Sequence, residues 1–136
     1  MLSTSEIVER LASALSTHDA GITAAYLFGS VARGTASATS DIDVGVLFRE
    51  EPPATLAGLR LDLEAELERE VGAPVQLVTL NRAPCDLVHR ALRDGILLFD
   101  RDPSRRIRFE VRARNEYFDL KPHLDRYRRM PPAARR

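Results

Sequence analysis

Two short motifs in the first third of this 136-residue chain combine residue types that bind phosphate and metal. Gly29-Ser30 comes first, and Asp41-x-Asp43 follows after ten intervening residues. A glycine lets the backbone approach a ligand closely, and a helix that starts there presents free N–H groups to a phosphate. The Ser30 hydroxyl can donate one more hydrogen bond, and Arg33, one helical turn further on, can pair with a phosphate oxygen.

The second motif is suited to a divalent metal. Side chains two positions apart on a strand point to the same face, so the carboxylates of Asp41 and Asp43 are expected to lie together. Two carboxylates this close repel each other unless a cation lies between them. Mg²⁺ uses one or two carboxylates together with substrate phosphates. Each motif alone is common in ordinary turns and surface strands, but in combination they predict a nucleotide and metal site.

Two strands and a short helix are expected to position these motifs. The apolar run 24–28 predicts a strand that ends at Gly29, and a short helix follows over 30–34. A second strand is expected over 42–48, which is rich in apolar and β-branched residues. The phosphate-binding turn and the two carboxylates would then lie on consecutive strands.

The rest of the chain alternates between helical and strand patterns. Helices are expected over 4–17, 54–70, from Pro84 to Gly95 and from 103 onward, with strands over 75–80 and 96–99. Ser3 and Glu6 fit a capping box at the first helix. This alternation predicts one α/β domain, a small mixed sheet flanked by helices, with a long C-terminal helix. Residues 1–100 would form the core, and 101–136 a helix and basic tail of the same domain.

The last helix is expected to face inward through Ile107, Val111 and Phe118, and to be interrupted at Pro122. Its charge is distinctive within a chain of zero net charge. Residues 101–136 carry twelve Lys and Arg against five Asp and Glu, whereas 1–100 carry eight against fifteen. Such a basic segment could contact an acidic partner or nucleic acid.

Composition excludes several other classes of protein. A single cysteine, Cys85, excludes a disulfide framework and cysteine-rich zinc sites. The sequence contains no run of about 18 apolar residues, so no transmembrane helix is expected. The first residues lack the basic region of a signal peptide, so a cytoplasmic location and no membrane partner are expected.

These residues resemble the DNA polymerase β-like nucleotidyltransferase superfamily. Within it, the chain is similar to the minimal nucleotidyltransferases (MNT proteins), which are often antitoxins paired with a HEPN-domain ribonuclease toxin. The resemblance covers about residues 5–100 and rests on the two motifs above. Three flanking stretches agree with it: 32–34, 80–84 and 92–95.

The resemblance implies a role for each motif residue. Gly29, Ser30 and Arg33 would bind the phosphates of ATP, and Asp41 and Asp43, the catalytic carboxylates, would hold one or two Mg²⁺ ions. An acceptor hydroxyl would attack the α-phosphorus, and pyrophosphate would leave. The implied acceptor is a tyrosine of the HEPN toxin, which would receive AMP in a hetero-oligomeric complex.

One position departs from the family pattern. The family usually has a third carboxylate on the next strand, where this chain has Gln76. An amide can hydrogen-bond or coordinate weakly, but it cannot act as a base. Two alternatives therefore stay open: an antitoxin that neutralises its toxin by binding alone, and a nucleotidyltransferase that acts on a small molecule or RNA. The basic C-terminal segment gives some support to RNA.

Overall fold

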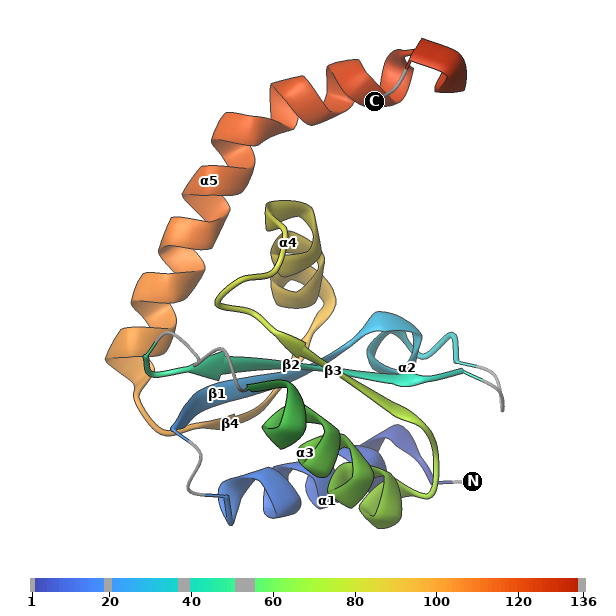
Figure 1. Cartoon of the computed structure of the whole chain (residues 1–136), viewed down its shortest axis with the longest axis vertical. Coiled ribbons are helices and arrows are strands. Elements are labelled where there is room, and N and C mark those ends of the chain that lie inside the picture. The colour runs from blue at the N-terminus through green and yellow to red at the C-terminus, as the bar shows by residue number, and fades with distance from the viewer. Residues whose placement is uncertain (1, 19–20, 37–39, 51–55, 135–136) are drawn as a thin grey trace.

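The computed structural model describes residues 2–18, 21–36, 40–50 and 56–134. The first two residues of the helix expected over 54–70 lie outside these ranges. In chain order the elements are α1 (Thr4–Ser16), β1 (Ile22–Phe28), α2 (Gly29–Arg33), β2 (Ile42–Phe48), α3 (Leu56–Val71), β3 (Val75–Thr79), α4 (Cys85–Asp94), β4 (Ile96–Asp100), α5 (Pro103–Arg129) and the 3₁₀ turn η1 (Pro132–Ala134). The expected α/β fold with a long C-terminal helix is confirmed (Figure 1).

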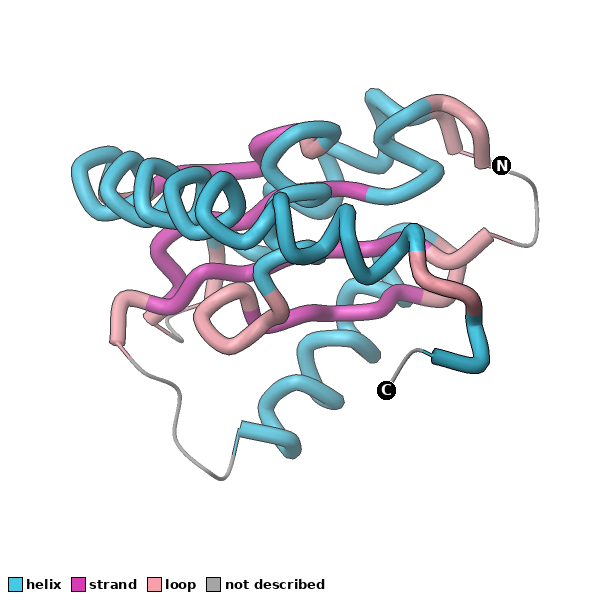
Figure 2. Tube along the Cα trace, turned by 90° about the horizontal axis from the view of Figure 1, so that it is seen from above, coloured by secondary structure: helices cyan, strands magenta, loops and turns pink. Residues whose placement is uncertain are grey.

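The four strands form a mixed sheet in the order β3-β2-β1-β4. β1 is antiparallel to both of its neighbours, β2 and β4, while β2 and β3 are parallel. The parallel pair needs a crossover, which α3 supplies. Helices α1 and α3 cover one face of the sheet, and α4 and the first part of α5 lie over the other (Figures 1 and 2).

The core is divided by the sheet into two apolar layers. Alternation along β2 sends Ile42, Val44 and Val46 into the layer under α1 and α3, while Leu47 belongs to the layer under α4 and α5. Asp43 alternates with Ile42 and Val44 along the strand, so its side chain lies on the α4 side of the sheet, as that of Leu47 does. Asp43 therefore faces the side on which α2 and α4 meet.

The packing of α5 differs from the expectation. Phe109 and Ala113 are its buried residues, whereas Ile107, Val111 and Phe118 are 49%, 47% and 68% exposed. The prediction that these three face inward was wrong. At 3.6 residues per turn they lie within about 40° of one another, on the side of the helix away from Phe109. The helix therefore carries two apolar stripes, and periodicity alone does not tell which one packs on the sheet.

Pro122 also does not interrupt α5, which is helical on both sides of it. A proline removes one backbone hydrogen bond and bends a helix, and Figure 1 shows α5 curving over α4. Two contacts hold it there. Tyr117 stacks on His89 with ring centroids 3.5 Å apart, and Arg128 Nη2 lies 3.1 Å from Asp86 Oδ1. These tertiary contacts explain why the helix continues past its proline.

Residues from α5 and two strands form a polar network that fastens the helix to the sheet. The Tyr26 hydroxyl donates to Glu110 Oε1 at 2.7 Å. Arg106 donates from Nε to Asp100 at 2.5 Å and from Nη1 to Glu110 at 3.1 Å. Burial, and next the hydrogen bond to Glu110, raise the pKa of Tyr26, so its hydroxyl stays a neutral donor.

In the described part of the chain, no helix is long and apolar enough to cross a membrane.

Replacing Arg106 by Met is expected to destabilise the fold by about 2–3 kcal/mol, because it removes the cation that pairs with both Asp100 and Glu110. Asp100 and Glu110 are each only 14% exposed. The midpoint of thermal unfolding should fall by roughly 10 °C. Arg114→Met is the matched control. Its guanidinium lies 3.8 Å from the same Glu110 but is 57% exposed, so its loss should amount to less than about 1 kcal/mol. Equal losses in the two variants would contradict this account.

Candidate functional site

The two sequence motifs meet at one end of β1 and β2. Phe28, the last residue of β1, is paired with Asp43 on β2, and Gly29 follows it directly. A side-chain carbon placed on Gly29 would overlap Oδ2 of Asp43 and lie 3.2 Å from its carboxyl carbon. The backbone of the first motif is therefore in contact with a carboxylate of the second.

Gly29 is required at this point for two independent reasons. Its φ of +75° lies in the left-handed region, which residues with a side chain rarely adopt. In addition, the space that a Cβ would need is already taken by the Asp43 carboxylate. The sequence predicted a glycine that allows a close approach, and the group that approaches it is Asp43.

The expected short helix after this glycine is present as α2, which is followed by the C-cap residue Gly34 with φ +75°. Its N-cap residue, Phe28, makes no side-chain capping hydrogen bond. Ser30 is half-buried at the start of the helix, and Arg33 lies in its last turn with a side chain 50% exposed. Figure 1 shows α2 at the end of the sheet, beside the last residues of β1. Ser30 thus lies directly beside the contact between Gly29 and Asp43, and the charges of Arg33 and Asp41 both act on Asp43.

Arg33 has a partner that sequence reasoning missed. Its Nη1 lies 3.9 Å from Oδ2 of Asp94, at the end of α4. Asp94 is bound more tightly by Arg93, at 3.0 and 2.8 Å, and this hydrogen bonding, together with the charge of Arg33, lowers the pKa of Asp94. Because Arg33 is only loosely paired and half-exposed, it can turn to another anion. No sequence spacing signals this pair, since α2 and α4 meet only in the fold.

The two aspartates have different surroundings. Asp41 is exposed, whereas Asp43 is half-buried. Burial, and then the negative charge of Asp41, raise the pKa of Asp43, while Arg33 lowers it. An ionised Asp43 is therefore poorly compensated by the described protein. A bound cation would relieve this, and carboxylate oxygens are the ligands that Mg²⁺ prefers.

Gln76 lies beside this site. It is paired in register with Asp43 across the parallel strands β2 and β3, and it is exposed. Register partners share a face of the sheet, so the amide lies on the same face as the carboxylate. Among the described residues, no group of three or more His, Cys, Asp or Glu side chains could hold a metal ion. The donor set here is the two aspartates, which fits a Mg²⁺ ion that also binds substrate phosphates.

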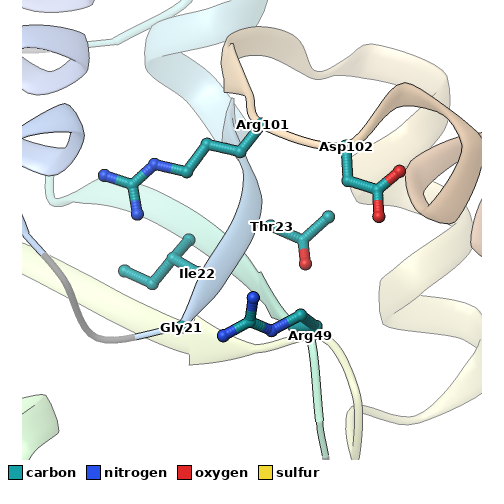
Figure 3. Close-up of a pocket in the computed structure, with 6 residues that line it drawn as sticks. All are labelled: Gly21, Ile22, Thr23, Arg49, Arg101 and Asp102. Carbon is teal, nitrogen blue, oxygen red and sulfur yellow. The ribbon is translucent and has the colours of Figure 1, made fainter.

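A hollow of about 280 Å³ lies near the opposite end of β1 (Figure 3). It is lined by Gly21, Ile22, Thr23, Arg49, Arg101 and Asp102. Arg101 donates at 2.7 Å to the carbonyls of Ser16 and His18, and Asp102 accepts the backbone N–H of Arg105 at the start of α5. Two of its charged side chains therefore hold helix ends in place. A seven-residue strand, roughly 20 Å, separates this hollow from the motif site.

Comparisons with known proteins give the family of this chain and solved structures that share its fold. Residues 9–104 match the family model described as polymerase beta, nucleotidyltransferase. No curated protein matches the chain. A toxin–antitoxin structure solved with AMP-PNP is 25% identical, with a TM-score of 0.72 over 85% of this chain and 90% of that chain.

Two further solved structures share the fold at lower identity. One chain in the structure of the toxin–antitoxin pair MntA–HepT is 22% identical to this chain. The match has a TM-score of 0.66 and covers 86% of this chain and 89% of that chain. The complex of a tri-AMPylated Shewanella oneidensis HEPN toxin with its MNT antitoxin is also 22% identical, with a TM-score of 0.69 over 88% and 91%.

Proposed function

Because the chain belongs to the polymerase beta nucleotidyltransferase family, we propose that it moves AMP from ATP to a tyrosine hydroxyl of a cognate HEPN-domain toxin and so acts as an antitoxin. The observation that carries the proposal is the contact between the Gly29 backbone and the Asp43 carboxylate. It brings a turn suited to phosphates and a ligand suited to Mg²⁺ within reach of one triphosphate. ATP and a HEPN partner imply that the protein acts in the cytoplasm.

Each motif residue has a defined role in this proposal. The backbone at Gly29 and the Ser30 hydroxyl bind the phosphates. The Arg33 side chain turns from Asp94 to the phosphates and balances their negative charge. Asp41 and Asp43 hold Mg²⁺, which when bound neutralises charge on the phosphates and on the leaving group. The tyrosine oxygen forms a bond to the α-phosphorus, and the bond from that phosphorus to the bridging oxygen breaks. Pyrophosphate leaves with that oxygen, and the tyrosine proton passes to water.

The solved relatives support the choice of nucleotide and acceptor. One toxin–antitoxin structure contains AMP-PNP, an analogue of ATP. Another contains a HEPN toxin that carries AMP groups. A nucleotide with an adenine base and a protein acceptor are therefore the first substrates to test.

The direct test is intact-mass spectrometry of the HEPN toxin after incubation with this protein, ATP and Mg²⁺. We expect the toxin to gain one or more adenylate units. Replacing Mg²⁺ by EDTA, or omitting this protein, should abolish the gain. A tight complex that shows no gain in mass would overturn the proposed transfer.

A second candidate function is neutralisation of the toxin by binding alone. The observation that favours it is the amide of Gln76, which is paired in register with Asp43 at the position where the family usually has a carboxylate. The discriminating experiment measures growth of cells that produce the toxin together with Asp43→Asn. Full protection by this variant would favour binding alone, and loss of protection would favour transfer.

Restoring a carboxylate by Gln76→Glu is expected to raise the rate of AMP transfer by at least about tenfold, because a positioned general base contributes about 10²–10⁴-fold. The apparent affinity for Mg²⁺ should rise with the added negative charge. Both are measured from initial rates of toxin modification across a Mg²⁺ titration. Gln76→Ala is the control and should show neither gain. An unchanged rate in Gln76→Glu would show that no base is missing at this position.

A further inference from the structure

One face of α5 is largely open to solvent in the described part of the chain. Ile107, Val111 and Phe118 form a stripe along it, and all three side chains are about half or more exposed. Single exposed apolar residues are ordinary on a protein surface. Three on one stripe of a rigid helix, spread over roughly 16 Å, are the kind of patch that marks an interaction site.

The stripe continues into a shallow hollow on the second half of α5. This hollow, of about 440 Å³, is lined by Phe118, Lys121, Pro122, Asp125, Arg126 and Arg129. Lys121 Nζ lies 3.5 Å from Asp125 Oδ2, so the one carboxylate of the lining is already paired. Neither Arg126 nor Arg129 forms an ion pair with any carboxylate of the described residues. An exposed aromatic ring is therefore bordered by two uncompensated cations.

Contacts on an adjacent side of α5 hold this face in position. The stacking of Tyr117 on His89 and the pair of Arg128 with Asp86 both tie α5 to α4. The side chains of the stripe and the hollow lie on the side that these contacts leave open. A surface held rigidly before binding loses less conformational entropy when a partner docks.

We propose that this outer face of α5, made of Ile107, Val111, Phe118, Arg126 and Arg129, docks the partner protein through a segment whose apolar side chains are flanked by carboxylates. The identity of that partner as the HEPN toxin rests on the proposed function. Apolar groups at the centre and charges at the rim are the usual composition of such an interface. The two arginines supply the charges that an acidic rim would complement.

Two other occupants fit these observations less well. A second copy of the chain would bring two strongly basic helices together, since residues 101–136 carry twelve cations against five anions. RNA would be bound through stacking on aromatic side chains and through phosphate contacts. Ile107 and Val111 offer neither of these, and they gain from burial only against an apolar surface.

The test is the affinity of the full-length protein for the toxin, measured by calorimetry without ATP. Phe118→Ser and the double change Arg126→Glu with Arg129→Glu should each weaken binding at least about tenfold. The double variant should also lose much of the salt dependence. Arg112→Glu is the matched control, a charge reversal on another side of the same helix at a position 72% exposed. It should bind within about twofold of the unmodified protein.

The outcomes separate this proposal from the proposed function. Circular dichroism and ATP binding confirm that each variant is folded. If Phe118→Ser and the double variant bind the toxin as the unmodified protein does, or if that protein does not bind it, the docking face is wrong. If the unmodified protein and Asp43→Asn both bind the toxin with the same affinity but neither transfers AMP, the proposed enzymatic function is wrong and the docking face is not. Loss of salt-sensitive RNA binding in these variants, with toxin affinity unchanged, would assign the face to RNA and overturn the proposal.

Discussion

Asp43→Asn is expected to lower the rate of AMP transfer by at least about 100-fold. An amide removes the charge that holds the metal, and metal stabilisation of a phosphoryl transition state contributes several kcal/mol, at about 1.4 kcal/mol for each tenfold. The neighbouring Asp41 is exposed, and it cannot by itself replace the charge that Asp43 loses. The rate of toxin modification measures the effect. Asp62→Asn, the same change on an exposed position of α3, should leave the rate unchanged.

The same substitution should make the metal-free fold more stable at neutral pH. Burial and the charge of Asp41 raise the pKa of Asp43 above its value in the unfolded chain. Protonation of Asp43 therefore stabilises the folded state. This contribution is complete below the pKa of the unfolded chain, about 3.9, and is lost as the pH rises through the pKa of the folded chain. Asn removes the unfavourable charge, so its advantage should be present at pH 7 and vanish near pH 3. Thermal unfolding in EDTA measures it, and a less stable variant at pH 7 would contradict the assignment.

Gly29→Ala is expected to reduce transfer by at least about 100-fold and to destabilise the fold by about 1–2 kcal/mol. The stability loss comes from the left-handed backbone at φ +75°, which an L residue adopts at this cost. The activity loss comes from the overlap with Asp43, since the new methyl group must displace its carboxylate. Misplacing a reacting group by about 1 Å is enough for a 100-fold effect.

Gly72→Ala separates these two causes. Gly72 has φ +68°, and a Cβ there would meet nothing within 4 Å. This variant should therefore lose a similar stability and keep full activity. Stability is measured by denaturant unfolding and activity by toxin modification. If Gly29→Ala were as active as Gly72→Ala, the contact between the two motifs would have no catalytic role.

Local sequence signals determined the elements and much of the fold class. The expected strand over 42–48 matches β2 (Ile42–Phe48), because an apolar, β-branched run bounded by polar residues has no competing helical period. The Ser3 and Glu6 capping box is formed as expected. Interactions of this kind span a few residues, so the order of side chains along the chain is enough to predict them. The apolar runs 24–28 and 42–48 likewise predicted β1 and β2, at whose ends the two motifs lie.

Only the tertiary structure decided what these elements bring together. The contact of Gly29 with Asp43, the pairing of Arg33 with Asp94 and the register of Gln76 beside Asp43 all depend on how strands and helices pack. The same holds for α5, where two apolar stripes have the same helical period. The stripe of Phe109 faces the sheet and that of Phe118 faces out. Periodicity assigns both stripes to a buried face. The choice between them comes from long-range contacts, such as that of Tyr26 with Glu110, which no local pattern encodes.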